Sequence, residues 1–265
     1  HHGLQYALTD EHSMAFLRGV ASELDRRKLA LQLIPRLGRK GAWDAAFLTT
    51  ADAVIIHDQV PQTLVPQLHA LHKPLVLIDS PFQDFARVNI ADLEGATVAA
   101  EYALSKRPDR VLVCALPMGP EEFADVCADP LCACAYSVAG LRLKGYLGAL
   151  QLSGMPDTHI DIITVPDLDP ESALTLVRPK LNKYKRAKLT TAVLCMSDRM
   201  ALPMVGLADL GVVALVGFDD IAPSAQAGLT TVRQDSYAKG VQAVCIALDT
   251  QTSITMPTEL VVRQT

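Results

Sequence analysis

Long apolar runs are missing from this sequence. Half of its 265 residues are apolar, yet no run approaches the roughly 20 residues that a helix needs to cross a bilayer. The start, His1-His2-Gly3, lacks the basic and then apolar layout of a secretory signal, and its histidines resemble a tag remnant that we exclude. We therefore expect a globular cytoplasmic protein of one or two domains, with no membrane partner.

Cysteine is scarce. The six cysteines are too few and too scattered for a disulfide framework in a chain of this size, so we expect free thiols in a reducing compartment. Cys127, Cys132 and Cys134 could be thiolate metal ligands at an unusual spacing, or small apolar residues, and we favour the second interpretation. His69 and His72 have helical spacing, but no further ligand cluster lies nearby, so a solvated helix face is favoured over a metal site.

An excess of positive charge is also absent. The formal net charge is −5, and lysine and arginine are dispersed along the chain. Nucleic-acid-binding domains usually carry a basic face, because neutralising phosphates supplies most of their affinity. The densest basic stretch, Lys180–Lys188, is interpreted as a solvated helix end. This chain by itself is not expected to hold DNA.

The common catalytic signatures are missing as well. We find no Gly-x-Gly-x-x-Gly after a strand, no Gly-Lys-Ser/Thr loop and no Gly-x-Ser-x-Gly elbow. We therefore expect a protein that is not an enzyme and that uses no cofactor, although missing motifs do not by themselves exclude catalysis.

Short aliphatic runs alternate with amphipathic stretches. The runs are typical of strands buried on both faces, and they are Ala53–His57, Leu75–Asp79, Val111–Ala115, Ala192–Met196 and Val213–Gly217. The stretches with helical spacing are Leu17–Leu24, Ala96–Ala103, Leu143–Leu150, Ala201–Ala208 and Val241–Leu248. This alternation predicts an α/β fold with parallel, doubly wound sheets covered by helices, and two sheets fit the number of units better than one.

Polar residues follow the predicted strands, where open α/β sheets bind their ligands. They are His57-Asp58, Asp79-Ser80, Ser197-Asp198 and Asp219-Asp220. Asp and Ser also cap helices, and we favour that role for Asp198, because Ser197-Asp198 precedes a helix expected to begin at Arg199. A cap explains only one residue of the Asp219-Asp220 pair.

Six different motifs follow one another along the chain: Lys73–Asp79, Arg142–Tyr146, Ser197–Leu202, Val216–Ile221, Leu229–Asp235 and Met256–Gln264. In order and spacing they resemble the LacI/GalR family of sugar-responsive repressors, over almost the entire chain. The run Thr230–Gln234 favours repressors over periplasmic sugar-binding proteins, which have the same core fold.

The resemblance implies two subdomains of the periplasmic sugar-binding-protein type, joined by three crossovers, with the effector in the cleft between them. We place the crossovers near Pro117, Asp235 and Thr250. The N-terminal subdomain would hold residues 1–116 and 236–250, and the C-terminal one residues 117–235 and 251–265. The helix-turn-helix headpiece of such regulators is expected to be absent from this chain.

Some features depart from the family pattern. Gly211-Val212 runs almost directly into the strand before Gly217, so a loop is shortened or residues are missing. The connection Pro35–Ala42 is brief, and Pro117–Tyr136 does not follow the usual pattern. Pro203 would remove a backbone donor from the predicted helix Ala201–Ala208, at a cost of roughly 3 kcal/mol unless that helix bends.

Arg142 and Asp219 are the leading candidates for ligand contacts. Sugar hydroxyls need groups that donate and accept in pairs inside a water-poor site. The resemblance places Arg142 at the family's effector-contacting arginine; the alternative is an exposed helix residue lying over Tyr146. Asp219 ends a strand and can accept from two hydroxyls; the alternative is a turn-forming aspartate.

Five further residues are candidates on weaker grounds. Ser197 is a ligand contact or a helix cap, and Gln234 a ligand or hinge contact. Asp92 is a ligand contact or an acid favoured at a helix N-terminus. His12 and Ser13 lie where relatives often present stacking aromatics, which argues against a stacked planar base and for a smaller or more polar ligand.

We therefore expect a homodimeric effector-sensing core of a LacI-type regulator that binds a small sugar-like metabolite. Operator DNA would be contacted only through the headpiece. Two other interpretations stay open: a periplasmic sugar-binding protein serving a transporter, and an α/β enzyme acting on a nucleoside or sugar phosphate. An upstream helix-turn-helix would indicate the regulator, and an upstream cleavable leader would indicate the periplasmic protein. Turnover of the ligand would reveal an enzyme.

Overall fold

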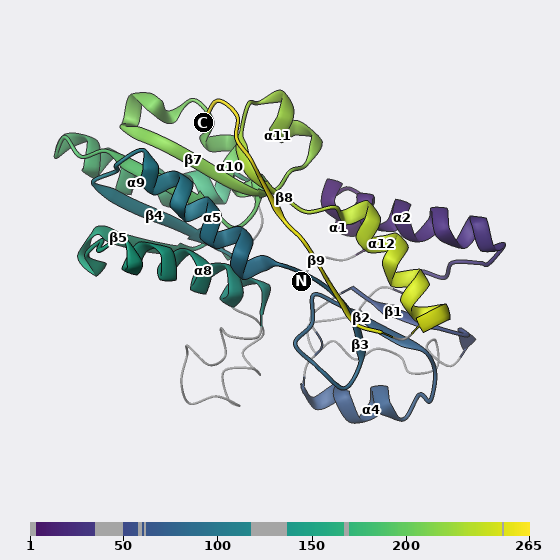
Figure 1. The fold of residues 1–265 in the computed structure, drawn as a ribbon. Coiled ribbons are helices and arrows are strands. Elements are labelled where there is room, and N and C mark those ends of the chain that lie inside the picture. The colour runs from purple at the N-terminus through teal and green to yellow at the C-terminus, as the bar shows by residue number, and fades with distance from the viewer. Residues whose placement is uncertain are drawn as a thin grey trace. The chain divides into compact units, whose positions relative to one another are not determined.

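The computed structural model divides the chain into two compact units (Figure 1). The first consists of His1–Ile90 and Asp235–Met256, and the second of Ala91–Gln234 and Pro257–Thr265. The structure describes residues 4–34, 50–57, 60, 62–117, 137–166, 170–250 and 252–265. The chain therefore passes from one unit to the other three times, and the predicted fold class, two doubly wound parallel-sheet subdomains, is confirmed.

The first unit is built on a parallel four-stranded sheet of order β1-β2-β3-β9. Its strands are β1 (Val54–Ile56), β2 (Leu75–Ile78), β3 (Ala86–Ile90) and β9 (Ile254–Met256). Its helices are α1 (Leu4–Ala7), α2 (Glu11–Arg27), α4 (Val65–His69) and α12 (Ser236–Cys245); a 3₁₀ turn, Gln62–Leu64, precedes α4 and a π-helical turn, Ile246–Thr250, follows α12.

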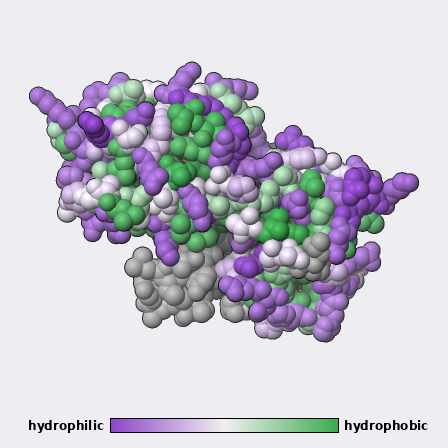
Figure 2. All heavy atoms as spheres, in the orientation of Figure 1, coloured by the Kyte–Doolittle hydropathy of each residue, from purple (hydrophilic) through white to green (hydrophobic). Residues whose placement is uncertain are grey.

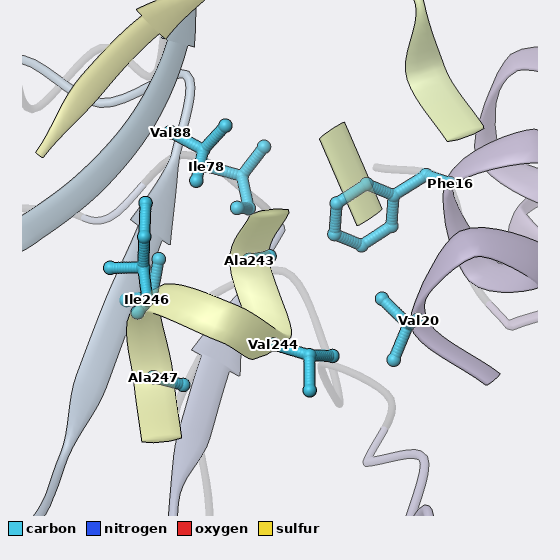
Figure 3. Close-up of a cluster of buried hydrophobic side chains, with 9 residues drawn as sticks. Phe16, Val20, Ile78, Val88, Ala243, Val244, Ile246 and Ala247 are labelled. Atoms are coloured by element: carbon cyan, nitrogen blue, oxygen red, sulfur yellow. The ribbon is translucent and has the colours of Figure 1, made fainter. Parts of the chain in front are cut away.

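Alternate residues of β2 serve two hydrophobic cores, because successive strand residues point to opposite faces of a sheet. Val76 and Ile78 join one cluster, and Leu75 and Leu77 the other. In the first cluster, shown in Figure 3, Phe16 and Val20 of α2 face side chains from α12 and the sheet. Both helices therefore bury their apolar stripes on one face of this sheet.

The helices α2 and α12 cross at two glycines. A Cβ atom on Gly19 would clash with the carbonyl of Tyr237, and one on Gly240 would clash with the carbonyl of Phe16. Figure 1 shows the two helices side by side. The absence of side chains at these two positions is what allows the backbones to approach so closely.

The second unit contains a six-stranded sheet of order β10-β8-β7-β6-β4-β5, parallel except for β10. The strands are β4 (Arg110–Ala115), β5 (Ile160–Thr164), β6 (Thr191–Cys195), β7 (Val212–Asp219), β8 (Thr230–Arg233) and β10 (Glu259–Val261). The α-helices are α5 (Asp92–Ser105), α8 (Val138–Leu152), α9 (Pro170–Arg186), α10 (Asp198–Ala201) and α11 (Ala222–Gln226), with 3₁₀ turns at Asp157–His159, Leu202–Met204 and Leu207–Leu210.

Small residues also set the packing of α5 and α8. The inward stripe of α5 consists of fully buried alanines, and a Cβ atom on Gly145 of α8 would clash with the carbonyl of Leu93. The five predicted strands are all present, with small shifts of their ends. Cys114, Cys195 and Cys245 are free thiols, as predicted. Among the described residues, every helix is too short or too polar to span a membrane.

Two predicted boundaries differ from the structure. Residues 91–116 lie in the second unit, because β4 pairs with β5 and β6 in the middle of its sheet. The first crossover thus follows Ile90 and not Pro117. The last follows Met256 and not Thr250, since β9 pairs with β3 of the first unit. The crossover predicted near Asp235 is where the second one lies.

The predicted helix Ala201–Ala208 is wrong. The helix α10 ends at Ala201, and Pro203 lies in the 3₁₀ turn that follows, where its missing N–H costs no helical hydrogen bond. Gly211, with a φ of 81°, leads directly into β7, as the short connection suggested. The segments 35–49 and 118–136, which include Cys127, Cys132 and Cys134, lie outside the described residues, as do His1 and His2.

Substituting Gly240→Ala should destabilise the first unit. A methyl group would force apart α2 and α12, and overpacking of this kind costs about 1–3 kcal/mol. Urea unfolding followed by circular dichroism measures the change. Gly148→Ala is the control, because the space around Gly148 within α8 is open, and there alanine should leave stability unchanged or raise it by up to about 1 kcal/mol. Equal effects of both substitutions would contradict the role of the crossing.

Candidate ligand site

Five of the predicted site residues meet in the second unit. They come from separate elements: Asp92 begins α5, Arg142 lies in α8, Ser197 precedes α10, Asp219 ends β7 and Gln234 follows β8. Three of these positions lie at the carboxyl ends of β6, β7 and β8, which are neighbours in the sheet. This is the edge at which α/β sheets bind ligands.

Arg142 is buried at the centre of this group, with 4% of its side chain exposed. Its Nε donates to Asp92 Oδ1 at 2.7 Å, and its Nη1 donates to the Met196 carbonyl at 2.5 Å. The guanidinium carbon lies 3.5 Å from the centre of the Phe218 ring. The alternative of an exposed helix residue is therefore wrong.

Asp219 is a second carboxylate beside this guanidinium, with 3.7 Å between its Oδ1 and Arg142 Nη1. Gln234 Nε2 donates to Asp219 Oδ1 at 2.6 Å, and Ser197 Oγ donates to Oδ2 at 3.1 Å. The backbone of Asp219 has a φ of 115°, which is costly for a residue other than glycine, and such strain is often found at functional sites. These contacts fix the carboxylate while leaving 11% of the side chain exposed.

Asp220 makes different contacts from Asp219, which explains why the chain has two consecutive aspartates here. Its Oδ2 accepts from Arg233 Nε at 2.7 Å, and its Oδ1 accepts from Arg263 Nη2 at 2.6 Å. Arg263 also donates to the Leu229 carbonyl. Asp220 thus fastens the C-terminal segment to the sheet, whereas Asp219 belongs to the site.

Asp92 and Ser197 each combine a structural contact with their place in the site. Asp92 lies in the first turn of α5, where a negative charge is favoured, and it is also the counter-ion of Arg142. Burial opposes the charge of Arg142, but Asp92 and Asp219 outweigh this effect and raise its pKa. Ser197 is the N-cap of α10, and its Oγ accepts from the Arg199 amide.

Asp198, expected to be only a cap, is a buried junction. Its carboxylate accepts from the hydroxyls of Thr231 at 2.5 Å and Ser224 at 2.6 Å, and from the Ile221 amide at 3.1 Å. Burial, and then the charge of Asp219, raise its pKa to about 7. A side chain on Gly217 would clash with Asp198 Oδ1, which explains glycine inside β7. No local sequence signal links Asp198 to donors so far along the chain.

His12 and Ser13 belong to the first unit. Ser13 donates through its amide and its hydroxyl to Asp10, so it completes the N-cap of α2. His12 Nδ1 shares a hydrogen bond of 2.7 Å with Ser236 Oγ, and its ring lies 6.2 Å from that of His57. The structure therefore gives both residues contacts within their own unit, and a ligand contact remains a prediction for each.

Sequence reasoning did not identify Lys239 in the first unit. This lysine of α12 is fully buried, and its Nζ donates to both carboxylate oxygens of Asp79, at 3.0 and 2.9 Å. Asp79 follows β2 with a φ of 51°. The burial of Lys239 could not be predicted from the sequence, because a lone lysine in an amphipathic helix usually faces solvent.

We call Asp92, Arg142, Ser197, Asp219 and Gln234 the second-unit group. This group offers hydrogen-bond acceptors and donors held in fixed positions. Carboxylate and amide oxygens with an arginine behind them suit hydroxyl groups. Within the described ranges, no three His, Cys, Asp or Glu side chains gather in an arrangement that could hold a metal ion. His69 stacks on Phe85 instead.

Comparisons with known proteins agree with these motifs. An HTH-type transcriptional regulator of Mycobacterium tuberculosis is 26% identical over 255 residues, which cover 91% of this chain and 70% of the regulator. A putative LacI-type regulator structure from Bacillus cereus has a TM-score of 0.78 at 20% identity, covering 99% of this chain and 94% of its own. A LacI-family regulator structure from Enterococcus faecium with bound ribose has a TM-score of 0.72 at 16% identity, covering 97% and 94%.

No family model matches the sequence. The solved structures are too distant in sequence to show more than the fold, which this chain shares with them over nearly its whole length. Together with the regulator from M. tuberculosis, they confirm the resemblance to LacI-type regulators that the sequence motifs indicated.

The contribution of Asp198 to stability should fall as pH rises from about 4 to about 7, because folding favours the protonated form of Asp198, whose pKa is about 7 in the folded chain. The unfolded chain releases this proton near pH 4. His57, whose pKa is lowered to about 4 by burial, changes stability in the opposite direction over this range, so the contribution of Asp198 is measured against a variant. Asp198→Asn mimics the protonated acid, so the variant should lack this component of at most about 1.4 kcal/mol per pH unit. Urea unfolding at pH 5, 6, 7 and 8 measures both proteins. Parallel pH profiles would contradict the assignment.

Proposed function

We propose that this chain is the effector-sensing core of a LacI-type transcriptional regulator, and that the effector is a small sugar-like metabolite bound by the second-unit group. The single observation that carries the proposal is the placement of Asp219: its carboxylate is held by Gln234 and Ser197 and backed by Arg142 at the carboxyl edge of the sheet. In this proposal four residues contact the ligand or hold its contacts in place: Arg142, Asp219, Ser197 and Gln234.

The chemistry of the group favours hydroxyls. A sugar presents several donors and acceptors in fixed directions, and a pre-positioned carboxylate can accept from two of them. Asp92 acts in this scheme through Arg142, which it holds in place. The ribose-bound regulator from Enterococcus faecium, whose fold this chain shares, supports a sugar-like ligand.

Effector binding would act by shifting a population of conformations. Such a shift requires that the ligand bind one conformation more tightly than the other. In a dimeric regulator the shift changes how paired DNA-binding headpieces meet their half-sites. We propose that this protein works in that way, as a cytoplasmic homodimer whose operator contacts come from a helix-turn-helix headpiece.

The homodimer is itself part of the proposal. Large apolar side chains are exposed in both units, such as Leu31 and Leu248 in the first and Val98 and Leu152 in the second. On the face drawn in Figure 2, apolar surface occurs in patches separated by hydrophilic residues. Apolar faces of this kind can supply a subunit interface.

The two alternatives make different predictions. A periplasmic sugar-binding protein would be monomeric and would be made with a cleavable leader. An enzyme acting on a nucleoside or sugar phosphate would convert its ligand. The regulator from M. tuberculosis, similar over 91% of this chain, favours a sensor over both.

A thermal-shift panel of sugars, sugar phosphates and nucleosides tests the proposal. A ligand at about 100 times its dissociation constant adds about 2.7 kcal/mol to the free energy of unfolding, so the midpoint should rise by several degrees. Mass spectrometry should recover the stabilising compound unchanged. A panel without any stabilising member, or with a converted one, would count against the sensor.

Asp219→Asn should weaken binding of the stabilising sugar at least tenfold, because the amide accepts fewer hydrogen bonds from hydroxyls. Asp220→Asn is the matched control: it removes the same charge from the next residue, which holds Arg233 and Arg263 and not the ligand. Titration calorimetry measures both variants. Equal losses of affinity would show that the ligand is bound elsewhere.

A further inference from the structure

The charged groups of the site are layered, with the cation inside and the carboxylate outside. In the second unit Arg142 is 4% exposed, and its nearest exposed partner, Asp219, is 11% exposed. Arg142 is further occupied by Asp92, the Met196 carbonyl and the Phe218 ring. The surface that a ligand meets here is therefore the carboxylate.

The first unit repeats this layering with unrelated residues. Lys239 has no exposed side-chain surface, whereas the Asp79 side chain that it contacts is 18% exposed. The turn after Asp79 is held by Asn89, whose amide oxygen accepts from the Ser80 amide and whose amide nitrogen donates to the Ser80 carbonyl. A buried lysine thus supports a carboxylate that faces outward at the end of β2.

Asp79 is ionised. Burial alone would raise its pKa, but the Lys239 ammonium, and His57 and His12 after it, hold that pKa below its usual value. Desolvation makes an unpaired buried lysine very unfavourable, so Lys239 and Asp79 stabilise each other's charged form. Burial lowers the pKa of His57 to about 4, so at pH 8 its imidazole adds no cation to this surface.

We propose that the effector carries no acidic group: the outward carboxylate of Asp219 selects an uncharged polyol or an amino sugar against sugar phosphates and sugar acids, and Asp79 disfavours anions in the same way at its own surface in the first unit. The inference rests on the proposed function, since it assumes a sugar-like effector. Its physical basis is repulsion between like charges: an anion at either carboxylate gains little from cations that are already paired and buried behind it.

Matched ligands test the selectivity at pH 8. The panel pairs D-ribose with ribose 5-phosphate, and D-glucose with glucosamine, gluconate and glucose 6-phosphate, each in a thermal-shift titration. The neutral or amino member of a series should stabilise the protein, and its acidic counterpart should bind at least tenfold more weakly. An acidic member that binds as tightly as its neutral counterpart would overturn the inference and leave the sensor proposal intact.

A second experiment needs no known effector. Inorganic phosphate is titrated at pH 8 into ¹⁵N-labelled wild type, Asp79→Asn and Asp84→Asn, with the Ser80 amide as the reporter. Asp84 is an exposed acid of the same unit, so its variant loses the same charge without uncovering Lys239. Phosphate should bind Asp79→Asn at least tenfold more tightly than wild type or Asp84→Asn.

Wild type that binds phosphate as well as Asp79→Asn does would overturn the layering, as would a folded Asp79→Asn that gains no phosphate affinity. Circular dichroism checks folding, since this variant removes the Asp79 charge that faces a buried lysine. Asp219→Asn gives the same test in the second unit, where Arg142 keeps Asp92 as a partner, so we expect this variant to fold. If no sugar stabilises the protein but these phosphate gains appear, the sensor proposal fails and the layering stands.

Discussion

The second unit is organised around one buried arginine. Removing a guanidinium from water costs several kcal/mol unless counter-charges and acceptors replace the solvent. Arg142 receives them from Asp92 of α5, the carbonyl that follows β6 and Asp219 of β7, and it also lies on the Phe218 ring. Meeting that requirement ties α5, α8 and two central strands together at the carboxyl edge of the sheet. The candidate ligand site is thus a product of the same contacts that satisfy the buried charge.

The other aspartates near this edge each make a separate set of contacts. Asp219 is held outward by Gln234 and Ser197, while Asp220 fastens Arg233 and Arg263. Asp198 joins α10 to α11 and β8 through two hydroxyls and an amide. A fixed frame reduces the entropy lost when a ligand binds, because the polar groups are already placed. The first unit uses Lys239 in a comparable way, as an internal support for Asp79.

Periodicity predicted most of the architecture, with one wrong helix, and the resemblance led to misplaced subdomain boundaries. Five buried aliphatic runs became strands, since a run buried on both faces has few other structures available. The helix expected over Ala201–Ala208 stops at Ala201, because Pro203 cannot supply a helical donor. Residues 91–116 were assigned to the wrong unit, because no pattern within β4 reveals that its neighbours are β5 and β6.

By itself the sequence determined the strands, most helices, the α/β class and the resemblance to LacI-type regulators, and it named the five residues that meet in the second unit. Tertiary structure alone decided that Arg142 is buried with Asp92, that Asp198 is a junction, and that Lys239 is inside beneath Asp79. The physical reason is range. Propensity and periodicity act over a few neighbouring residues, whereas burial and ion pairing depend on side chains that only folding brings together.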